Sequence, residues 1–282
     1  MKSNRNKTIT VTDEEIKNFT FLEFPKQIKN ITEIENNIYL TDCLKSIKLI
    51  PDDSIDLILT DPPYNNRKNF GDGTVNLSKR EFENWNDSWI KECFRILKPT
   101  GSIYICIDWP NSGMIQNLLE QYFVAQNRIT WKREKGRGSK KNWKNNMEDI
   151  WFATKSKDYT FNLDQVKIKK EVIAPYKDSS GRPKDWVEKD GQKFRMTHPS
   201  NIWTDLTVPF WSMPENTEHP TQKPEKLIER IILASSNEND LVFDPFLGSG
   251  TTCVVAKRLK RKYLGFEINK KYYILGSKRL MK

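Results

Sequence analysis

Short apolar runs alternate with segments of helical periodicity along most of the chain. Continuous apolar runs of this kind are typical of strands buried on both faces of a parallel sheet. The alternation therefore predicts an α/β fold, built as one doubly wound, mostly parallel sheet domain. The expected strands lie at residues 38–40, 55–59, 102–107, 240–244 and 263–268. The expected helices lie at residues 44–50, 85–97, 112–123, 224–236, 251–261 and 270–280.

The pattern weakens at the start and in the middle of the chain. Residues 1–30 read as a weakly structured arm. A further strand begins at 128–131, and 148–154 reads as its hairpin partner. In residues 155–216 turn residues are common, and Trp186, Trp203, Phe210 and Trp211 are scattered, which is typical of an insertion with its own small core. We expect four segments: 1–30, 31–154, 155–216 and 217–282.

Composition narrows the class of protein. The chain has 282 residues, of which 37% are hydrophobic, enough for one sizeable core. It carries 47 Lys or Arg against 37 Asp or Glu, a formal charge of +10, which favours nucleic acid as a partner before an acidic membrane surface. No run approaches the roughly 18 apolar residues that a membrane span needs, and no secretory signal is visible, so we expect a cytoplasmic protein. The four cysteines form no C-x-x-C pair and there are only two histidines, so we expect no metal site.

The first candidate site follows the second expected strand, in the sequence LTDPPYNN at residues 59–66. Proline has no N–H and so ends a strand, which alone explains a turn here. A turn by itself leaves Asp61 and Tyr64, an acid and an aromatic beside two prolines, without a function.

A second signal is VFDPFLGSGTT at residues 242–252, a strand followed by a glycine turn and a helix. Glycines let the backbone approach a ligand, and a helix N-terminus offers free N–H groups. Glu267 ends the next strand, 23 residues after Asp244, where a nucleotide-binding fold holds a ribose. Cys253 occupies the third glycine position of a dehydrogenase loop, so that class does not fit, and a ligand-free tight turn is the alternative.

These two motifs, in this order and with HPTQKP at 219–224 between them, resemble the amino-group DNA methyltransferases of the permuted β group. The similarity covers roughly residues 37–282. It implies a circularly permuted Rossmann-like methyltransferase fold, with residues 155–216 in the place of the target-recognition region. It also implies S-adenosylmethionine as cofactor and double-stranded DNA as partner.

The resemblance implies a catalytic role for DPPY. Asp61 and the Pro62 carbonyl would accept hydrogen bonds from the two N–H groups of an exocyclic amino group. Pro62 and Pro63 would fix the backbone. Tyr64 would stack on a base flipped out of the duplex. Most of the rate would come from positioning and electrostatics, with no covalent enzyme intermediate.

The resemblance also implies cofactor contacts. Gly248 and Gly250 would lie beside the methionine part of the cofactor, and Thr251 and Thr252 would meet its carboxylate. Glu267 would hold the ribose hydroxyls. Asp42 resembles the acid that contacts the adenine, with an ordinary helix N-cap as the alternative; Lys223 would assist the carboxylate, with an exposed lysine as the alternative. The expected cofactor loop is Asp244, Pro245, Phe246, Gly248, Ser249, Gly250, Thr251 and Thr252.

A basic stretch at residues 131–146 has seven Lys or Arg against one Glu, a net charge of +6. We expect it to grip DNA phosphates beside the cleft, with a solvated charged loop as the alternative. Relatives often have His before an acid where this chain has Met147 and Glu148, and we assign that position no role. The expected DNA-binding residues are Lys132, Arg133, Lys135, Arg137, Lys140, Lys141 and Lys144.

Asp61 favours N6 of adenine as the target, because many N4-cytosine enzymes of the family carry serine there. The alternatives are N4 of cytosine, an RNA or protein-glutamine methyltransferase, and a catalytically silent nucleic-acid binding module. A cognate restriction endonuclease and a homodimer are further partners that the family suggests. The sequence does not give the target site.

Overall fold

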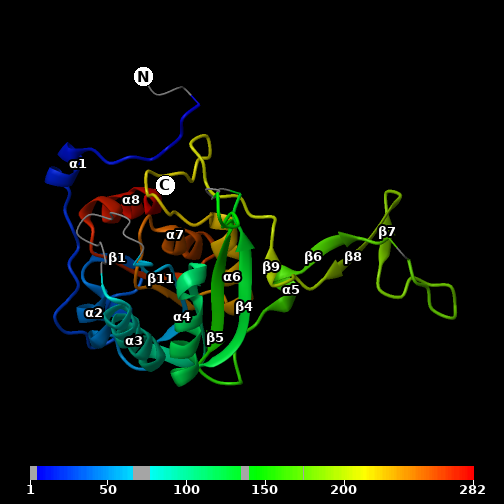
Figure 1. The fold of residues 1–282 in the computed structure, drawn as a ribbon, viewed down its shortest axis with the longest axis horizontal. Helices are drawn as coiled ribbons and strands as arrows, with labels where there is room; N and C mark the ends of the chain where they lie inside the picture. Colours follow the sequence, from blue (N-terminus) through cyan, green and yellow to red (C-terminus); the bar gives the residue numbers. More distant parts are fainter. Residues whose placement is uncertain (1–4, 66–76, 135–139, 174) are drawn as a thin grey trace.

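The centre of the molecule is an eight-stranded mixed sheet with the strand order β1-β11-β10-β2-β3-β5-β4-β9 (Figure 1). The computed structural model describes residues 5–65, 77–134, 140–173 and 175–282. The five strands from β1 to β3 are parallel, and β5 is antiparallel to both of its neighbours. The sheet strands are β1 (Asn37–Leu40), β2 (Ile55–Thr60), β3 (Leu97–Ile107), β4 (Val124–Lys132), β5 (Met147–Thr154), β9 (Ile202–Trp203), β10 (Leu241–Asp244) and β11 (Lys262–Glu267). The predicted α/β fold with a mostly parallel sheet is confirmed.

Helices cover both faces of this sheet. On one face lie α2 (Cys43–Ser46), the 3-10 turn η2 (Ile47–Leu49), α3 (Lys79–Ile96) and α4 (Trp109–Tyr122). On the other lie α6 (Glu225–Ser235), α7 (Thr251–Arg258) and α8 (Lys270–Leu280). No helix within the described part of the chain is long and apolar enough to cross a membrane.

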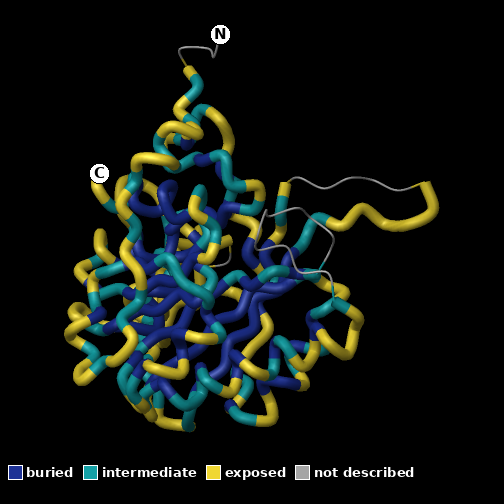
Figure 2. Tube along the Cα trace, turned by 90° about the vertical axis from the view of Figure 1, so that its left-hand side faces the viewer, coloured by how far each residue is buried: buried dark blue, intermediate teal, exposed yellow. Residues whose placement is uncertain are grey.

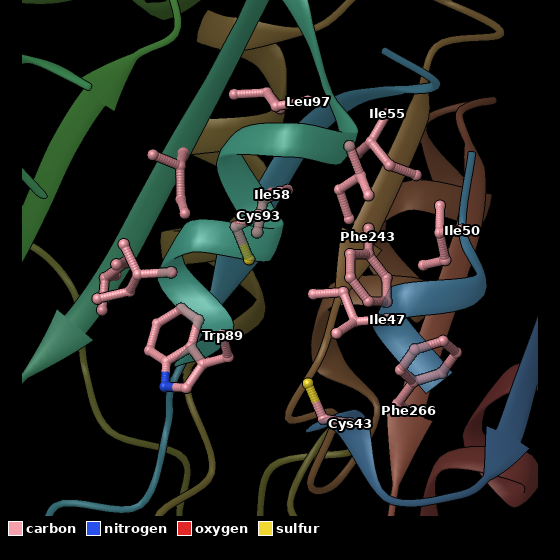
Figure 3. Packing of buried hydrophobic residues seen from close by; sticks show 14 of the residues in the cluster. Cys43, Ile47, Ile50, Ile55, Ile58, Trp89, Cys93, Leu97, Phe243 and Phe266 are labelled. Atoms are coloured by element: carbon pink, nitrogen blue, oxygen red, sulfur yellow. The ribbon is translucent and has the colours of Figure 1, made fainter. Parts of the chain in front are cut away.

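The apolar run of β2 explains why both faces are covered. Ile58 packs under α3, whereas Leu57 and Leu59 point to the opposite face, beneath α6. Phe243 of β10 and Phe266 of β11 fill the first face, in the same cluster as Trp89 of α3 (Figure 3). All of these side chains are at most 1% exposed, and burying each one stabilises the fold by about 1.5–3 kcal/mol.

The order of strands places two distant parts of the chain side by side. From β10 the sheet continues through β11 to β1 on one side, and through β2 and β3 on the other. Strand order therefore reverses between β10 and β2, and in doubly wound folds ligands bind beyond the carboxyl ends of the strands at such a point. Asp244 ends β10, and Asp61 directly follows β2.

Two predicted strand boundaries need correction. β3 begins at Leu97, five residues before the predicted strand, because the chain passes directly from α3 into extended backbone. Pro99 lies where the pairing of β2 with β3 skips from Leu97 to Ser102, so it removes no donor from the regular ladder. β4 begins at Val124, before the predicted start at residue 128, and forms the expected hairpin with β5.

Residues 168–197 form a separate three-stranded antiparallel sheet, the appendage, which projects from the body (Figure 1). Its strands are β6 (Ile168–Glu171), β7 (Val187–Lys189) and β8 (Gln192–Thr197), and the short helix α5 (Leu163–Val166) precedes them. The prediction of one small core for 155–216 is wrong in part. Trp203 of β9 belongs to the core of the main sheet, because β9 pairs with β4.

The N-terminal arm has little regular structure, with α1 (Asp13–Asn18) and the 3-10 turn η1 (Ile31–Glu33), but it packs closely on the body. Phe19 and Phe21 contact Tyr273 of α8, and Phe24 packs on Phe266. Ile9 pairs with residues 216–218, just before the HPTQKP segment. The arm therefore supports one side of the strand edge described below.

Candidate active site

A cavity of about 320 Å³ lies at the carboxyl edge of the parallel strands. Its walls come from segments that are far apart in the sequence. They include Asp42, the DPPY segment, HPTQKP residues, the glycine loop after β10 and Glu267. The fold thus brings the two predicted motifs to a single cavity.

Asp61 lies in this cavity with both carboxylate oxygens engaged. The hydroxyl of Tyr64 donates to Oδ1, and the ammonium of Lys223 donates to Oδ2. Asn111 holds the turn by donating to the main-chain oxygen of Tyr64 at 3.0 Å. Burial raises the pKa of Asp61; Lys223 opposes this rise, and the negative charge of Glu148 adds to it.

Glu148, at the start of β5, completes a buried cluster. Its Oε1 accepts the Tyr64 hydroxyl at 2.6 Å and the Lys223 ammonium at 2.7 Å, and its Oε2 accepts Nη1 of Arg133 at 2.9 Å. Burial alone would raise the pKa of Glu148, but Lys223 and Arg133 outweigh it, so the pKa is lowered. The four charges of Asp61, Glu148, Lys223 and Arg133 balance, as a buried ionic cluster requires.

A second cavity of about 140 Å³ lies on the other side of this cluster. It shares Tyr64, Thr221, Gln222 and Lys223 with the larger cavity, and its wall also includes Trp131 and Glu148. Tyr64 and Lys223 thus line both cavities, with Asp61 on the side of the larger one.

The glycines of the loop are needed for conformation and for space. Gly248 and Gly250 have φ of +55° and +79°, in the left-handed region that disfavours other residues. A Cβ on Gly250 would lie 2.7 Å from Cα of Gly276 in α8, and one on Gly248 would lie 3.1 Å from Nε2 of His219. The loop therefore passes very close to its neighbours, which places the start of α7 at the cavity.

Two buried acids fix the shape of this loop. Asp244 accepts the hydroxyl of Thr252 at 2.7 Å and the N–H of Phe246 at 3.1 Å. Glu267 accepts the N–H groups of Gly248 at 2.7 Å and Asn269 at 2.8 Å. Burial, against these hydrogen bonds, raises the pKa of Asp244 to about 6 and the pKa of Glu267 to about 7.

Arg279 of α8 donates hydrogen bonds to the glycine loop. Its Nη1 donates to the main-chain oxygen of Ser249 at 2.9 Å and to the hydroxyl of Thr251 at 2.8 Å. Its Nη2 donates to Glu225, the first residue of α6, at 2.8 Å. One buried guanidinium thus connects the glycine loop to the helix that directly follows Lys223 and Pro224.

The structure bears differently on the two alternatives that the sequence left open, those for Asp42 and Lys223. Asp42 caps α2 by accepting the N–H of Leu44 at 3.0 Å, and it also lines the cavity, so both interpretations of this residue remain compatible with its place. Lys223 is 7% exposed, so the exposed-lysine alternative is wrong. Its ammonium contacts Asp61 and Glu148, and the cofactor carboxylate that we expected it to assist stays a prediction.

The basic stretch divides into two parts. Arg133 turns inward to Glu148, whereas Lys132, Lys140, Lys141 and Lys144 are exposed. Lys135 and Arg137 lie outside the described residues. Trp131 is buried in the core of the sheet, while Trp143 is 93% exposed, so only the second of these tryptophans offers a free face.

Sequence reasoning missed Glu148 and Arg279. Glu148 had a signal, since an acid inside an apolar strand is costly to bury unless it is paired. Asp149 gives the same signal but points away, accepting the hydroxyl of Ser112 at 2.6 Å. Arg279 had no local signal, because its partners Ser249, Thr251 and Glu225 are 28 or more residues away.

The charges of the larger cavity fit the expected cofactor. Its wall holds the acids Asp42, Asp61, Asp244 and Glu267, with Lys223 as the one lysine or arginine among the described lining residues. S-adenosylmethionine carries a sulfonium and an ammonium against one carboxylate, so an acidic wall complements it. Within the described residues, no group of three or more His, Cys, Asp or Glu is arranged to hold a metal ion.

Comparisons with known proteins agree with this geometry. The family model described as DNA methylase matches residues 55–278. The type II methyltransferase M.HpaI of Haemophilus parainfluenzae is 36% identical over 252 residues, covering 88% of this chain and 74% of that protein. The DNA adenine methyltransferase YhdJ of Escherichia coli K12 is 39% identical over 247 residues, covering 85% and 80%.

Solved structures show the same fold. The M1.HpyAVI–SAM complex matches with a TM-score of 0.59 and 27% identity, covering 86% of this chain and 98% of that one. The cytosine-N4-specific PvuII DNA methyltransferase matches with a TM-score of 0.67 over 93% of this chain, but at 21% identity it bears on the fold alone. The chain therefore belongs to the DNA methylase family, and its predicted kinship with the S-adenosylmethionine-dependent amino-group DNA methyltransferases of the permuted β group is confirmed.

Proposed function

We propose that this protein transfers a methyl group from S-adenosylmethionine to the exocyclic N6 of an adenine flipped out of duplex DNA. The observation that carries the proposal is the position of Asp61. Its carboxylate lies at the carboxyl edge of the sheet, in the larger cavity, beside Tyr64 and Lys223, which also line the smaller one. One acid and one aromatic can thus meet both reactants.

The chemistry asks little of the protein beyond geometry. The lone pair of an exocyclic amino group is delocalised into the ring, so the nitrogen is a poor nucleophile. Asp61 and the Pro62 carbonyl accept hydrogen bonds from its two N–H groups and so favour a tetrahedral nitrogen. The ring of Tyr64 stacks on the base. The bound cofactor supplies an electrophilic methyl group on a sulfonium.

The cofactor's place is the larger cavity. Glu267 would offer acceptors to the ribose hydroxyls, and Asp42, in the wall of the same cavity, would contact the adenine ring. The start of α7 offers N–H groups to the carboxylate, since the hydroxyls of Thr251 and Thr252 already have internal partners. Asp244 has a second task, because it also fixes Thr252.

The choice of adenine rests on Asp61 and on the relatives. A carboxylate is the acceptor that the resemblance associates with adenine, and the similar protein of E. coli is named a DNA adenine methyltransferase. N4 of cytosine remains the alternative. The relatives named type II methyltransferases support a restriction–modification setting with an endonuclease that acts on the same DNA site.

The test is methyl transfer from labelled S-adenosylmethionine to duplex DNA, followed by digestion and separation of the nucleosides. We expect label in N6-methyladenine. Label in N4-methylcytosine would overturn the choice of base, and no label in DNA of varied sequence would overturn the proposal as a whole. An Asp61→Ala protein prepared in the same way controls for a contaminating methyltransferase.

A further inference from the structure

Glu148 is the one member of the buried cluster to which the resemblance assigns no role. It is 2% exposed, yet it is ionised and contacts the same two donors as Asp61. A buried acid of this kind is costly to retain, so its contacts call for a role beyond packing.

Both carboxylate oxygens of Asp61 already accept hydrogen bonds from side chains of the cluster. One oxygen of Asp61 accepts Tyr64 and the other accepts Lys223. An incoming amino group needs at least one of these oxygens as its own acceptor. If Tyr64 or Lys223 left Asp61 without another acceptor inside the protein, it would become a buried donor with no partner, which is costly.

Donor counting shows where these donors can go. Tyr64 has one hydroxyl proton but lies against both carboxylates, so it can satisfy only one of them at a time. The Lys223 ammonium has three protons and already reaches Glu148 at 2.7 Å and the Tyr64 oxygen at 3.3 Å. Both donors can therefore turn fully to Glu148 without moving to a new place.

We propose that Glu148 is a positioning residue, which takes over the Tyr64 hydroxyl and the Lys223 ammonium when the target amino group binds and so releases Asp61 as its acceptor. This inference rests on the proposed function. Arg133 makes Glu148 suited to the task, because it holds Oε2 at 2.9 Å and leaves Oε1 directed at the two donors. The exchange moves hydrogen bonds only and needs no further reactant.

The same contacts set how strongly Asp61 binds a proton. The charge of Glu148 raises the pKa of Asp61, whereas the charge of Lys223 lowers it. If Glu148 became neutral, the pKa of Asp61 would fall, and a rate that needs ionised Asp61 would keep its plateau to lower pH. The titratable groups around Asp61 are Lys223, Glu148, Tyr64, Cys106, Asp108 and Asp244.

The first experiment compares Glu148→Gln with Asp149→Asn. Both change a buried carboxylate of β5 to an amide, but Asp149 contacts Ser112 and Thr130 outside the site. With saturating cofactor and DNA, we expect Glu148→Gln to slow single-turnover methyl transfer about tenfold to a hundredfold and to shift its acidic limb to lower pH. We expect Asp149→Asn to keep the wild-type pH profile, and an equal effect of both changes would overturn the proposal.

The second experiment adds Lys223→Met. Lys223 also lowers the pKa of Asp61, so both variants are compared on their pH plateaus, where Asp61 is ionised. If Glu148 acts by drawing Lys223 off Asp61, Glu148→Gln/Lys223→Met should there be faster than Glu148→Gln by about tenfold. A double variant as slow as Glu148→Gln, or slower, would overturn the proposal, because a purely structural Glu148 gives that result. If Glu148→Gln does not fold, Glu148→Asp keeps the charge but shortens the reach, and a wild-type rate for it would overturn the takeover of the donors.

A third measurement does not depend on activity. The carboxyl pKa of Asp61 can be followed by carbon NMR in protein labelled at Asp, with Asp61→Asn to assign the signal. We expect it to be lower in Glu148→Gln than in wild type, and an unchanged pKa would overturn the proposal. Wild type that methylates cytosine would refute the adenine assignment alone, since both amino groups need the same acceptor.

Discussion

The carboxyl edge of the main sheet and the appendage at residues 168–197 are built in opposite ways. At the edge, Lys223, Glu148 and Arg279 are buried, and each has charged partners within the chain. In the appendage, apolar side chains of the strands face solvent: Ile168, Val187 and Met196 are 39–54% exposed. Figure 1 shows the appendage apart from the body, and Figure 2 shows buried segments running through the centre of the body.

This contrast indicates which region is preorganised for a reaction and which has a surface for a partner. Fixed, paired charges in a cavity are preorganised, and a preorganised site needs little rearrangement for its chemistry. Among the described residues of the appendage, Trp186 is the one buried apolar side chain, so most of its surface is available to a partner. We expect the edge to set the reaction and the appendage to set the DNA sequence, and each prediction below tests one side of this division.

The largest effect should come from Asp61→Ala. Removal of one preorganised group aimed at the reacting atoms typically costs about a hundredfold or more in turnover. Binding of S-adenosylhomocysteine should survive, because the glycine loop is held by Asp244, Glu267 and Arg279. Turnover and isothermal titration of the same preparation measure both. Near-normal methylation by this variant would remove Asp61 from the mechanism.

Excision of residues 168–197 tests the other region. Ile168 pairs with Thr197, so the two ends are neighbours and a short Gly/Ser linker can close the gap. We expect the fold and cofactor binding to persist, while preference for the target sequence falls about tenfold to a hundredfold for each base pair that the appendage reads. Thermal melting and methylation of matched target and non-target duplexes check this. Preserved sequence preference would show that another region reads the bases.

The same division accounts for what the sequence predicted. The apolar runs predicted the strands of the main sheet because burial on both faces leaves a local pattern. DPPY and the glycine loop were recognisable because a turn alone requires neither an acid beside an aromatic nor two glycines directly before a helix. Their meeting at one cavity followed from the topology, since carboxyl ends of parallel strands share an edge.

The contacts of the buried cluster were not predictable in this way. For Lys223 the sequence leaves a cofactor contact and an exposed lysine as alternatives, because nothing nearby in the sequence reveals Asp61 or Glu148 as its partners. Arg279 lies in the last turn of α8, where a basic residue ordinarily interacts with the helix dipole in solvent. Pairing between residues far apart in the chain is decided by the tertiary fold, and a single sequence does not display it.

The basic stretch at residues 131–146 should contribute affinity without specificity. Lys140, Lys141 and Lys144 are exposed. If all three are changed to Ala, affinity should fall about equally for target and non-target duplexes, and the slope of log K against log salt should flatten by up to about 0.9 for each lost phosphate contact. Anisotropy titrations at several salt concentrations measure the slope. Lys26, Lys29 and Lys48 changed together are the control, and a slope equal to that control would contradict phosphate binding.

The smallest effect concerns pH and the cofactor. Burial raises the pKa of Glu267 to about 7, so the cofactor-free protein holds this carboxyl partly protonated near neutrality. This raised pKa means that the stability which Glu267 contributes is lost as pH rises through about 7. Ribose hydroxyls donate hydrogen bonds and favour the ionised acceptor, so cofactor affinity should rise over the same interval and fall by up to about tenfold per pH unit below it.

Calorimetric titration with S-adenosylhomocysteine between about pH 6 and pH 8 measures this, with Glu267→Gln as the comparison. The variant should bind the cofactor more weakly, and its affinity should depend less on pH. The remaining pH dependence, at the acidic end, should come from Asp244, whose pKa is about 6. Equal pH dependence in both proteins would show that Glu267 holds the loop through Gly248 and Asn269 and does not meet the ribose.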